Sequence, residues 1–372
     1  MLPTFRNFAT LCGELTRHSE EKTNVFVLFF ARLFVTLQAI KTIDMEKQKD
    51  NTLLKARSYR SVLATGFRLY TENFRRLFKA SWQMALLYAL SCGALGTLAA
   101  IKIPELTAVI MKQVMQYQGV FIQPLLQYAT TLLAFIALCL LAVATLALAS
   151  ATILAKLKEH KETGSISTPP HWLTASPLMM GRTLKGVFCT LLVVLMPYIL
   201  ATIAFAVAVK VKPEMLHGNL ITIVATLFIV FIIVMAFALP LMHVLMKYLM
   251  EAPCNYWRTL GSYYGRALSH WGMLFLVFFV SILIVELASL VVMLPAHVLN
   301  MANQSAHNGM LLGDPLGMPS YMTALTFVTF TFCCFIEFYI GQVVMVHNYY
   351  VYGSIEAKEQ ERASSLSVDT KL

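Results

Sequence analysis

Two carboxylic acids in apolar stretches are the residues of this sequence best suited to chemistry. Glu286 and Glu337 each lie near the middle of an apolar stretch, and the two stretches are consecutive in the chain. A carboxylate in hydrocarbon is costly and normally faces a bundle interior or a water-filled cavity. The functional interpretation is a proton- or cation-responsive pair in which one carboxyl stays protonated, because two like charges cannot both ionise cheaply. The alternative is that each is a protonated packing residue, hydrogen-bonded to a neighbour such as Tyr339 or Gln342.

Proline residues mark a second group of candidates. Pro197, Pro240 and Pro295 lie within or near the ends of apolar stretches. Proline frees a backbone carbonyl and kinks a helix, so these positions either line a cavity or simply bend their helices. His243, one turn after Pro240, would join such a site or act as a hydrogen-bonded interfacial residue.

Metal and catalytic motifs give no further candidates. His297, His307 and Asp314 are irregularly spaced across a loop, which is not typical of a metal site. The sequence has no HExxH, GxSxG, P-loop or GxGxxG pattern. We therefore expect no catalytic residue, no cofactor and no metal.

The elements that must position these residues are membrane-spanning helices. The chain has 372 residues, of which 58% are hydrophobic and 13% charged, and its mean hydropathy is +0.68. Soluble domains carry about 25% charged residues. A bilayer core is crossed by about 20 apolar helical residues, and continuous apolar runs favour helices over the alternating strands of a barrel. We predict an all-α polytopic membrane protein with six transmembrane helices in three hairpins, over residues 80–103, 125–157, 187–209, 220–249, 272–297 and 321–351.

The segments outside these spans are predicted to include an N-terminal segment, two longer loops and a C-terminal tail. Residues 1–55 form an N-terminal cytoplasmic segment whose apolar stretch, Val25–Ile40, contains Arg32 and is therefore expected to lie at the interface rather than to span. Alternatively, Met45 is the true start and residues 1–44 are an over-called extension. Residues 56–352 form the transmembrane domain and 353–372 a cytoplasmic tail. Lys158–Pro170 and Val298–Ser320 are predicted to be loops.

The distribution of basic residues predicts orientation. Of the 29 Lys and Arg residues, all but Lys102, Lys112, Lys210 and Lys212 lie on the side that carries both termini. The positive-inside rule places that side in the cytoplasm. The net charge of +10 therefore indicates attraction to anionic lipid and not to nucleic acid.

Basic, aromatic helices are predicted just before the first and fifth spans. Apolar residues recur at steps of three and four over residues 63–78, and a similar pattern returns 197 residues later. The pattern indicates three copies of an interfacial helix followed by a hairpin, or simply the amphipathic approach common to many spans. The candidate lipid-interface residues are Arg60, Arg68, Arg75, Arg76, Lys79, Arg258 and Arg266.

Several segments carry a family resemblance. Gly66–Phe78 (GFRLYTENFRRLF), Ser269–Gly272 (SHWG), Gly313–Pro319 (GDPLGMP) and Tyr352–Glu356 (YGSIE) resemble the membrane domain of glycerophosphoryl diester phosphodiesterase-type proteins, and above all multi-pass proteins of Bacteroidota. The resemblance implies a bacterial inner membrane. The catalytic barrel of true phosphodiesterases has no counterpart here, so no catalytic residue is carried over.

Two classes of function follow from these patterns. The first is a non-enzymatic protein: a membrane-complex subunit, or a permease-like protein for a small solute or a lipid. The second is an intramembrane lipid-handling enzyme or regulator. Paired glutamates lining one water-accessible cavity would favour solute transport, whereas a lateral groove beside the basic helices would favour lipid handling.

Overall fold

The computed structural model describes residues 53–115, 129–168, 175–211, 236–251, 255–311, 319 and 321–369. The chain divides into two units, Met1–Asn51 and Thr52–Leu372. The expected apolar stretch Val25–Ile40, the alternative start at Met45 and the segment Gly313–Met318 lie outside the described residues.

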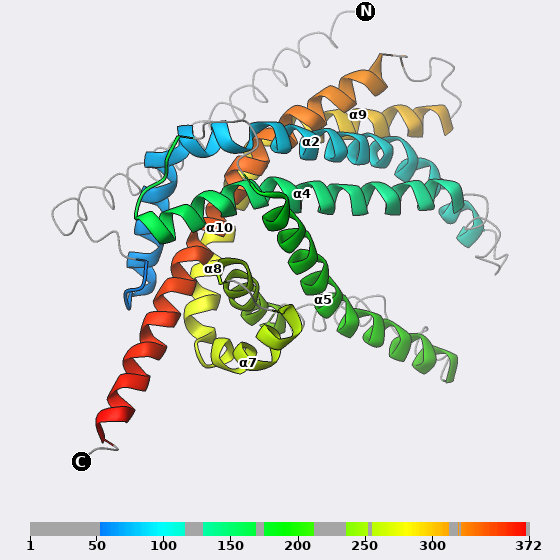
Figure 1. Cartoon of the computed structure of the whole chain (residues 1–372). Helices are drawn as coiled ribbons and strands as arrows, with labels where there is room; N and C mark the ends of the chain where they lie inside the picture. Colours follow the sequence, from blue (N-terminus) through cyan, green and yellow to red (C-terminus); the bar gives the residue numbers. More distant parts are fainter. Residues whose placement is uncertain are drawn as a thin grey trace, which may run out of the picture. The chain divides into compact units, whose positions relative to one another are not determined.

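The described residues are helical and contain no strand (Figure 1). The helices are α2 (Tyr59–Met115), α4 (Ala129–Thr163), α5 (Pro177–Val211), α7 (Tyr256–Ser269), α8 (Trp271–Val292), α9 (Leu294–Leu311) and α10 (Met322–Asp369), together with Ala236–Met250. Five of them, α2, α4, α5, α8 and α10, are long and apolar enough to cross a membrane. The all-α membrane prediction is confirmed at this level, whereas six spans in three hairpins stay a prediction.

The core forms where α10 packs against α2, which also packs against α4. Glycines of α2 allow the close approach, because a side chain at Gly93 would meet Thr331 and one at Gly96 would meet Phe330. Small residues serve this purpose in membrane helices, where packing rather than water drives association.

An aromatic contact continues the same interface further along both helices. The ring of Tyr339 lies 5.1 Å from that of Phe78 and 5.8 Å from that of Phe74, and the Tyr70 hydroxyl donates to the Tyr339 carbonyl at 2.6 Å. Aromatic pairs at these distances add stability beyond the area that they bury. The recurrence of aromatic residues on α2 thus serves packing on α10.

The helix Ala236–Met250 contains a proline whose cost is offset by a neighbouring side chain. Pro240 has no N–H, so the Ala236 carbonyl lacks its usual helical donor. The indole N–H of Trp271, the first residue of α8, donates to that carbonyl at 3.1 Å. Trp271 therefore ties the start of α8 to the proline turn.

The expected basic helix and the first span are parts of one helix, because α2 runs without a break through Trp82. One predicted element boundary in the first half of the chain was wrong. The predicted loop Lys158–Pro170 starts as helix, since α4 continues to Thr163 and ends at Gly164, whose φ of 73° is easily adopted only by glycine.

Two further boundaries were wrong in the second half. Residues 298–311 of the predicted outer loop are helical, because they belong to α9, in which Pro295 is tolerated in the first turn. The predicted tail from residue 353 continues α10 to Asp369. Its first residues are core, because Gly353 packs on Leu53 and the Ser354 hydroxyl accepts from the Arg57 amide at 2.9 Å. The predicted tail thus begins with helical residues that pack against the segment before α2.

The interfacial helix expected before the fifth span is present as a separate helix. α7 is amphipathic and ends at Ser269, one residue before α8 begins. Since α2 has no such break, the two predicted copies differ in form.

Candidate functional site

The structure brings the two predicted carboxylates together. Glu337 of α10 is half-buried and interacts electrostatically with Glu286 of α8 and with His297 of α9, and it lies beside Ser289. Glu286 is exposed on the surface of the described residues. Neither expected alternative partner holds Glu337: the hydroxyl of Tyr339 lies 3.3 Å from that of Ser81, and the side-chain oxygen of Gln342 has no hydrogen bond.

An apolar groove lies between α2, α8 and α10. This aromatic groove has a volume of about 470 Å³. It is lined by Phe67, Tyr70, Thr71, Phe74 and Phe78 of α2, by Ile284, Val285 and Ala288 of α8, and by Phe335, Ile336, Tyr339, Ile340 and Val343 of α10. Neither Glu286 nor Glu337 is among these residues. The groove offers a long apolar surface with aromatic walls and almost no polar atoms.

Basic residues follow one edge of the aromatic groove. Thr71, Phe74 and Phe78 of α2 line the groove. Arg75 directly follows Phe74, and Lys79 directly follows Phe78, so the two basic residues lie one helical turn apart at the edge of the groove. Both are exposed, and neither has an ion-pair partner among the described residues. Arg68, one turn before Thr71 and Glu72, lies 4.0 Å from the Glu72 carboxylate. Two cations that have no ion-pair partner in the described part of the chain therefore lie beside an apolar groove.

The other predicted lipid-interface residues have different surroundings. Arg76 is committed to the fold, because its guanidinium donates to the Asn73 side chain at 3.1 Å and to the Ile166 carbonyl at 2.8 Å. The remaining three are exposed. The guanidinium of Arg60 lies over the ring of Tyr59 and that of Arg266 over the ring of Tyr263, and Arg258 is exposed on α7.

A buried ion network joins Ala236–Met250 to α10. We call His243, Lys247, Glu251 and Glu356 the α10 ion network. Lys247 Nζ lies 2.6 Å from Glu356 Oε2 and 3.4 Å from Glu251 Oε1, and His243 Nε2 lies 3.5 Å from Glu356 Oε1. The ammonium also lies 3.9 Å from the centre of the Tyr263 ring. The contacts with two carboxylates and an aromatic ring offset part of the desolvation cost of burying this cation.

Tyrosines of α10 extend the α10 ion network to α4. The Tyr352 hydroxyl donates to Glu251 at 2.8 Å and accepts from Lys161 at 3.2 Å, and the Tyr349 hydroxyl lies 3.0 Å from His160 Nδ1. Sequence reasoning missed these residues apart from His243. The i, i+4, i+8 spacing of His243, Lys247 and Glu251 is a signal that could have indicated one polar helix face.

Arg182 of α5 also binds this region. Its guanidinium donates to the Tyr248 carbonyl and, at 2.7 Å, to the Glu251 carbonyl. Cations near the last carbonyls of a helix are favourable, because those groups lack helical donors. Charge and hydrogen bonds thus join the end of α4, the start of α5 and the end of Ala236–Met250 to the middle of α10, which is typical of a structural junction.

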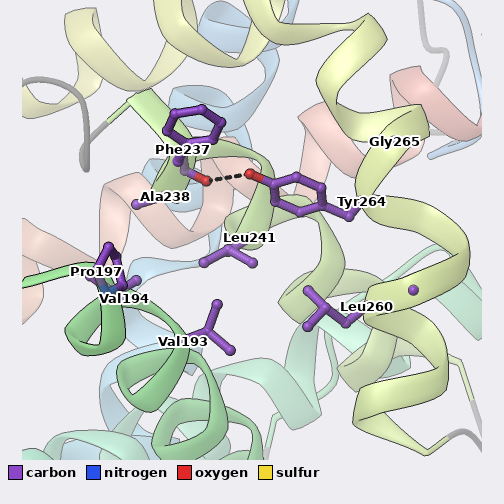
Figure 2. A pocket seen from close by; sticks show the side chains of 10 residues that line it. Val193, Val194, Pro197, Phe237, Ala238, Leu241, Leu260, Tyr264 and Gly265 are labelled. Atoms are coloured by element: carbon purple, nitrogen blue, oxygen red, sulfur yellow. Dashed lines mark hydrogen bonds between the residues drawn. The ribbon is translucent and has the colours of Figure 1, made fainter. Parts of the chain in front are cut away.

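A second apolar cavity, the α5–α7 pocket, has a volume of about 410 Å³. It is lined by Val193, Val194, Pro197, Phe237, Ala238, Leu241, Leu260, Gly261, Tyr264 and Gly265. Figure 2 shows Val193, Leu241 and Leu260 facing one space and the Tyr264 hydroxyl turned to Phe237, whose carbonyl accepts its hydrogen bond at 3.0 Å.

Tyr256 of α7 does not line the α5–α7 pocket, but it joins the two helices that form the pocket wall. Its hydroxyl lies 2.7 Å from that of Thr190 on α5. Burial raises the pKa of the Tyr256 phenol, and the Thr190 hydrogen bond partly offsets this rise. The phenol is therefore protonated at neutral pH and available for the bond that joins α5 to α7.

Comparisons with known proteins found no matching family model, no similar curated protein and no similar solved structure. The site must therefore be interpreted from its geometry. The described residues contain no group of three or more His, Cys, Asp or Glu side chains arranged to hold a metal. What they do provide is two apolar cavities, one of them edged by unpaired cations.

Proposed function

We propose that this chain is a non-enzymatic, permease-like integral membrane protein that binds and handles an anionic phospholipid. An acyl chain would lie in the aromatic groove, and the phosphate would lie beside Arg75 and Lys79. The observation that carries the proposal is the position of these two unpaired cations at the edge of an apolar groove on the same helix.

The chemistry of the groove matches the two ends of such a lipid. Apolar burial favours the chain by about 25 cal/mol per Å². Each Lys or Arg near an anionic lipid surface adds about 1 kcal/mol. A zwitterionic lipid gains the first contribution but little of the second, so the cations would provide selectivity for negative headgroups.

The proposal includes the side of the membrane on which the headgroup lies. The basic part of α2 would meet the cytoplasmic leaflet of a bacterial inner membrane, with both termini in the cytoplasm, as the charge asymmetry and the family resemblance suggest. Anionic lipids of that leaflet would then be the partners of Arg75 and Lys79.

Solute transport through a glutamate-lined cavity has less support. Glu286 and Glu337 are close to each other but line neither large apolar cavity. If they nonetheless carry a proton-responsive function, Glu286→Gln and Glu337→Gln should each shift the pH dependence of lipid retention. Unchanged retention and pH response in both variants would exclude the pair.

The test uses the whole protein in nanodiscs that contain equal amounts of phosphatidylglycerol and phosphatidylethanolamine. Native mass spectrometry after release measures which lipid stays bound. The wild type should retain phosphatidylglycerol in excess, and the double variant Arg75→Gln, Lys79→Gln should lose up to about 2 kcal/mol, or roughly thirtyfold, of that preference. The matched control, Arg258→Gln with Arg266→Gln, removes two exposed α7 cations and should leave the preference unchanged. Equal retention of both lipids by the wild type would refute the proposal.

A further inference from the structure

The mostly apolar α5–α7 pocket includes one backbone carbonyl that lacks its usual helical hydrogen bond. Pro197 of α5 has no N–H, so the carbonyl of Val193, four residues earlier, lacks its usual helical donor. Val193 and Pro197 lie four residues apart and therefore share one face of α5, the face on which the released carbonyl lies. Both Val193 and Pro197 line the pocket, which therefore presents a hydrogen-bond acceptor.

At the other proline turn a side chain replaces the missing helical donor, whereas at Pro197 none of the described side chains does so. At Pro240 the released Ala236 carbonyl receives the indole N–H of Trp271 at 3.1 Å. Among the described residues, no side chain donates to Val193 in the same way. A carbonyl in apolar surroundings gains from any donor that reaches it.

The remaining lining excludes charge from the pocket. Tyr264 supplies the only polar side chain among the lining residues described, and its hydroxyl already donates to Phe237. Burial raises the pKa of Tyr264, so the phenol remains a neutral donor. The complementary occupant is neutral and apolar, with one donor at its polar end.

Glycines keep the pocket open on the α7 side. A Cβ at Gly261 or at Gly265 would meet no atom within 4 Å. The cavity of about 410 Å³ lies within the size range of small-molecule and cofactor sites.

We propose that the α5–α7 pocket binds a neutral lipid alcohol of the diacylglycerol class, whose free hydroxyl donates to the Val193 carbonyl while its chains occupy the apolar lining. This site is separate from the aromatic groove and does not depend on an anionic headgroup. It gives the protein a place for an uncharged lipid beside one for a charged lipid.

The first experiment fills the pocket. Membranes containing the full chain are labelled with a photoreactive, alkyne-bearing diacylglycerol. Gly261→Leu and Gly265→Leu should each reduce labelling at least about fivefold, the effect of overpacking a site by about 1 kcal/mol. Both replacements improve helix propensity, so the fold should persist. Gly272→Leu on α8, which also meets open space but lies outside the pocket, is the matched control and should label as the wild type does. Equal labelling of all four proteins would place the lipid elsewhere and overturn the proposal.

The second experiment tests the hydrogen bond. The wild type should prefer the free-hydroxyl probe over its methyl ether by roughly threefold to tenfold. Pro197→Ala restores the amide that pairs with the Val193 carbonyl, so the preference should fall to about one. Pro177→Ala is the control, because a first-turn proline withholds no needed donor. A preference retained by Pro197→Ala would contradict the assigned role of the carbonyl, whereas loss of phosphatidylglycerol selectivity in the nanodisc assay concerns only the aromatic groove.

Discussion

Replacing Lys247 by methionine should be among the most destabilising single changes in the chain. The Lys247 side chain is 5% exposed, and that of Glu356 17%. Lys247→Met would remove the cation that lies 2.6 Å from Glu356 and 3.4 Å from Glu251, leaving the two carboxylates without the lysine that pairs them. Removing one partner of a buried pair costs about 3–5 kcal/mol, because the other charge stays buried and uncompensated.

The assay is unfolding in dodecylmaltoside micelles titrated with dodecyl sulfate, followed by far-ultraviolet circular dichroism. The control is Lys102→Met, which removes a pair of similar length, 2.9 Å to Glu105, whose side chains are 41% and 31% exposed. Exposed pairs contribute about 0–1 kcal/mol, so this variant should unfold almost as the wild type does. Removing both members of the closest pair with Lys247→Met and Glu356→Leu together should recover part of the loss, because Glu356 is then no longer a buried, uncompensated charge. Equal costs for Lys247→Met and Lys102→Met would refute the reasoning that burial makes this network strong.

Two further predictions concern packing and orientation. Gly353→Ala should destabilise the protein, because the new Cβ would lie 2.5 Å from the Leu53 carbonyl oxygen. Gly341→Ala on the same helix meets open space and should stabilise the protein by up to about 1 kcal/mol. The same unfolding titration compares the two variants, and equal shifts of their unfolding midpoints would contradict the Gly353–Leu53 contact. Single cysteines at Ser305 and Ser165, both exposed, should react with a membrane-impermeant maleimide from outside the cell only at position 305. The opposite labelling pattern would reverse the orientation.

The length and continuity of apolar runs were enough to predict the main helices. The span expected over residues 272–297 corresponds to α8, Trp271–Val292, although α8 ends five residues earlier than predicted, since Met293 caps it and α9 begins at Leu294. The approximate position of an apolar helix can be predicted from local sequence, because uncharged runs and prolines are visible in the sequence itself. The amphipathic character of α7 was predicted in the same way.

The continuation of α10 could not be read from local sequence. Residues after Tyr352 are polar and charged, which suggested a tail, but their partners lie far away in the chain. Ser354 pairs with Arg57, 297 residues earlier, and Glu356 with Lys247, 109 residues earlier. Such contacts turn a polar segment into core, and no periodicity of the segment itself indicates them.

The candidate site was predicted in its parts but not as a whole. The basic and aromatic residues of α2 were identified as lipid-facing, yet their groove exists only because α8 and α10 supply the other walls. A pair formed by the carboxylates Glu286 and Glu337 was one of two interpretations of the sequence, and the structure shows an electrostatic interaction between them. That they stand apart from both apolar cavities depends on how each helix is rotated, which one sequence does not specify.

Photo-crosslinking from within the aromatic groove tests the central proposal most directly. A benzophenone amino acid replaces Ala288, which lines the groove, or Phe279, which is 55% exposed on the same helix, and the protein is irradiated in bilayers of known composition. Mass spectrometry of the adducts then compares phosphatidylglycerol with phosphatidylethanolamine. We predict that adducts at position 288 are enriched in phosphatidylglycerol above the bilayer ratio, while those at position 279 follow that ratio. Adducts that follow the bilayer ratio at both positions would contradict a selective lipid site.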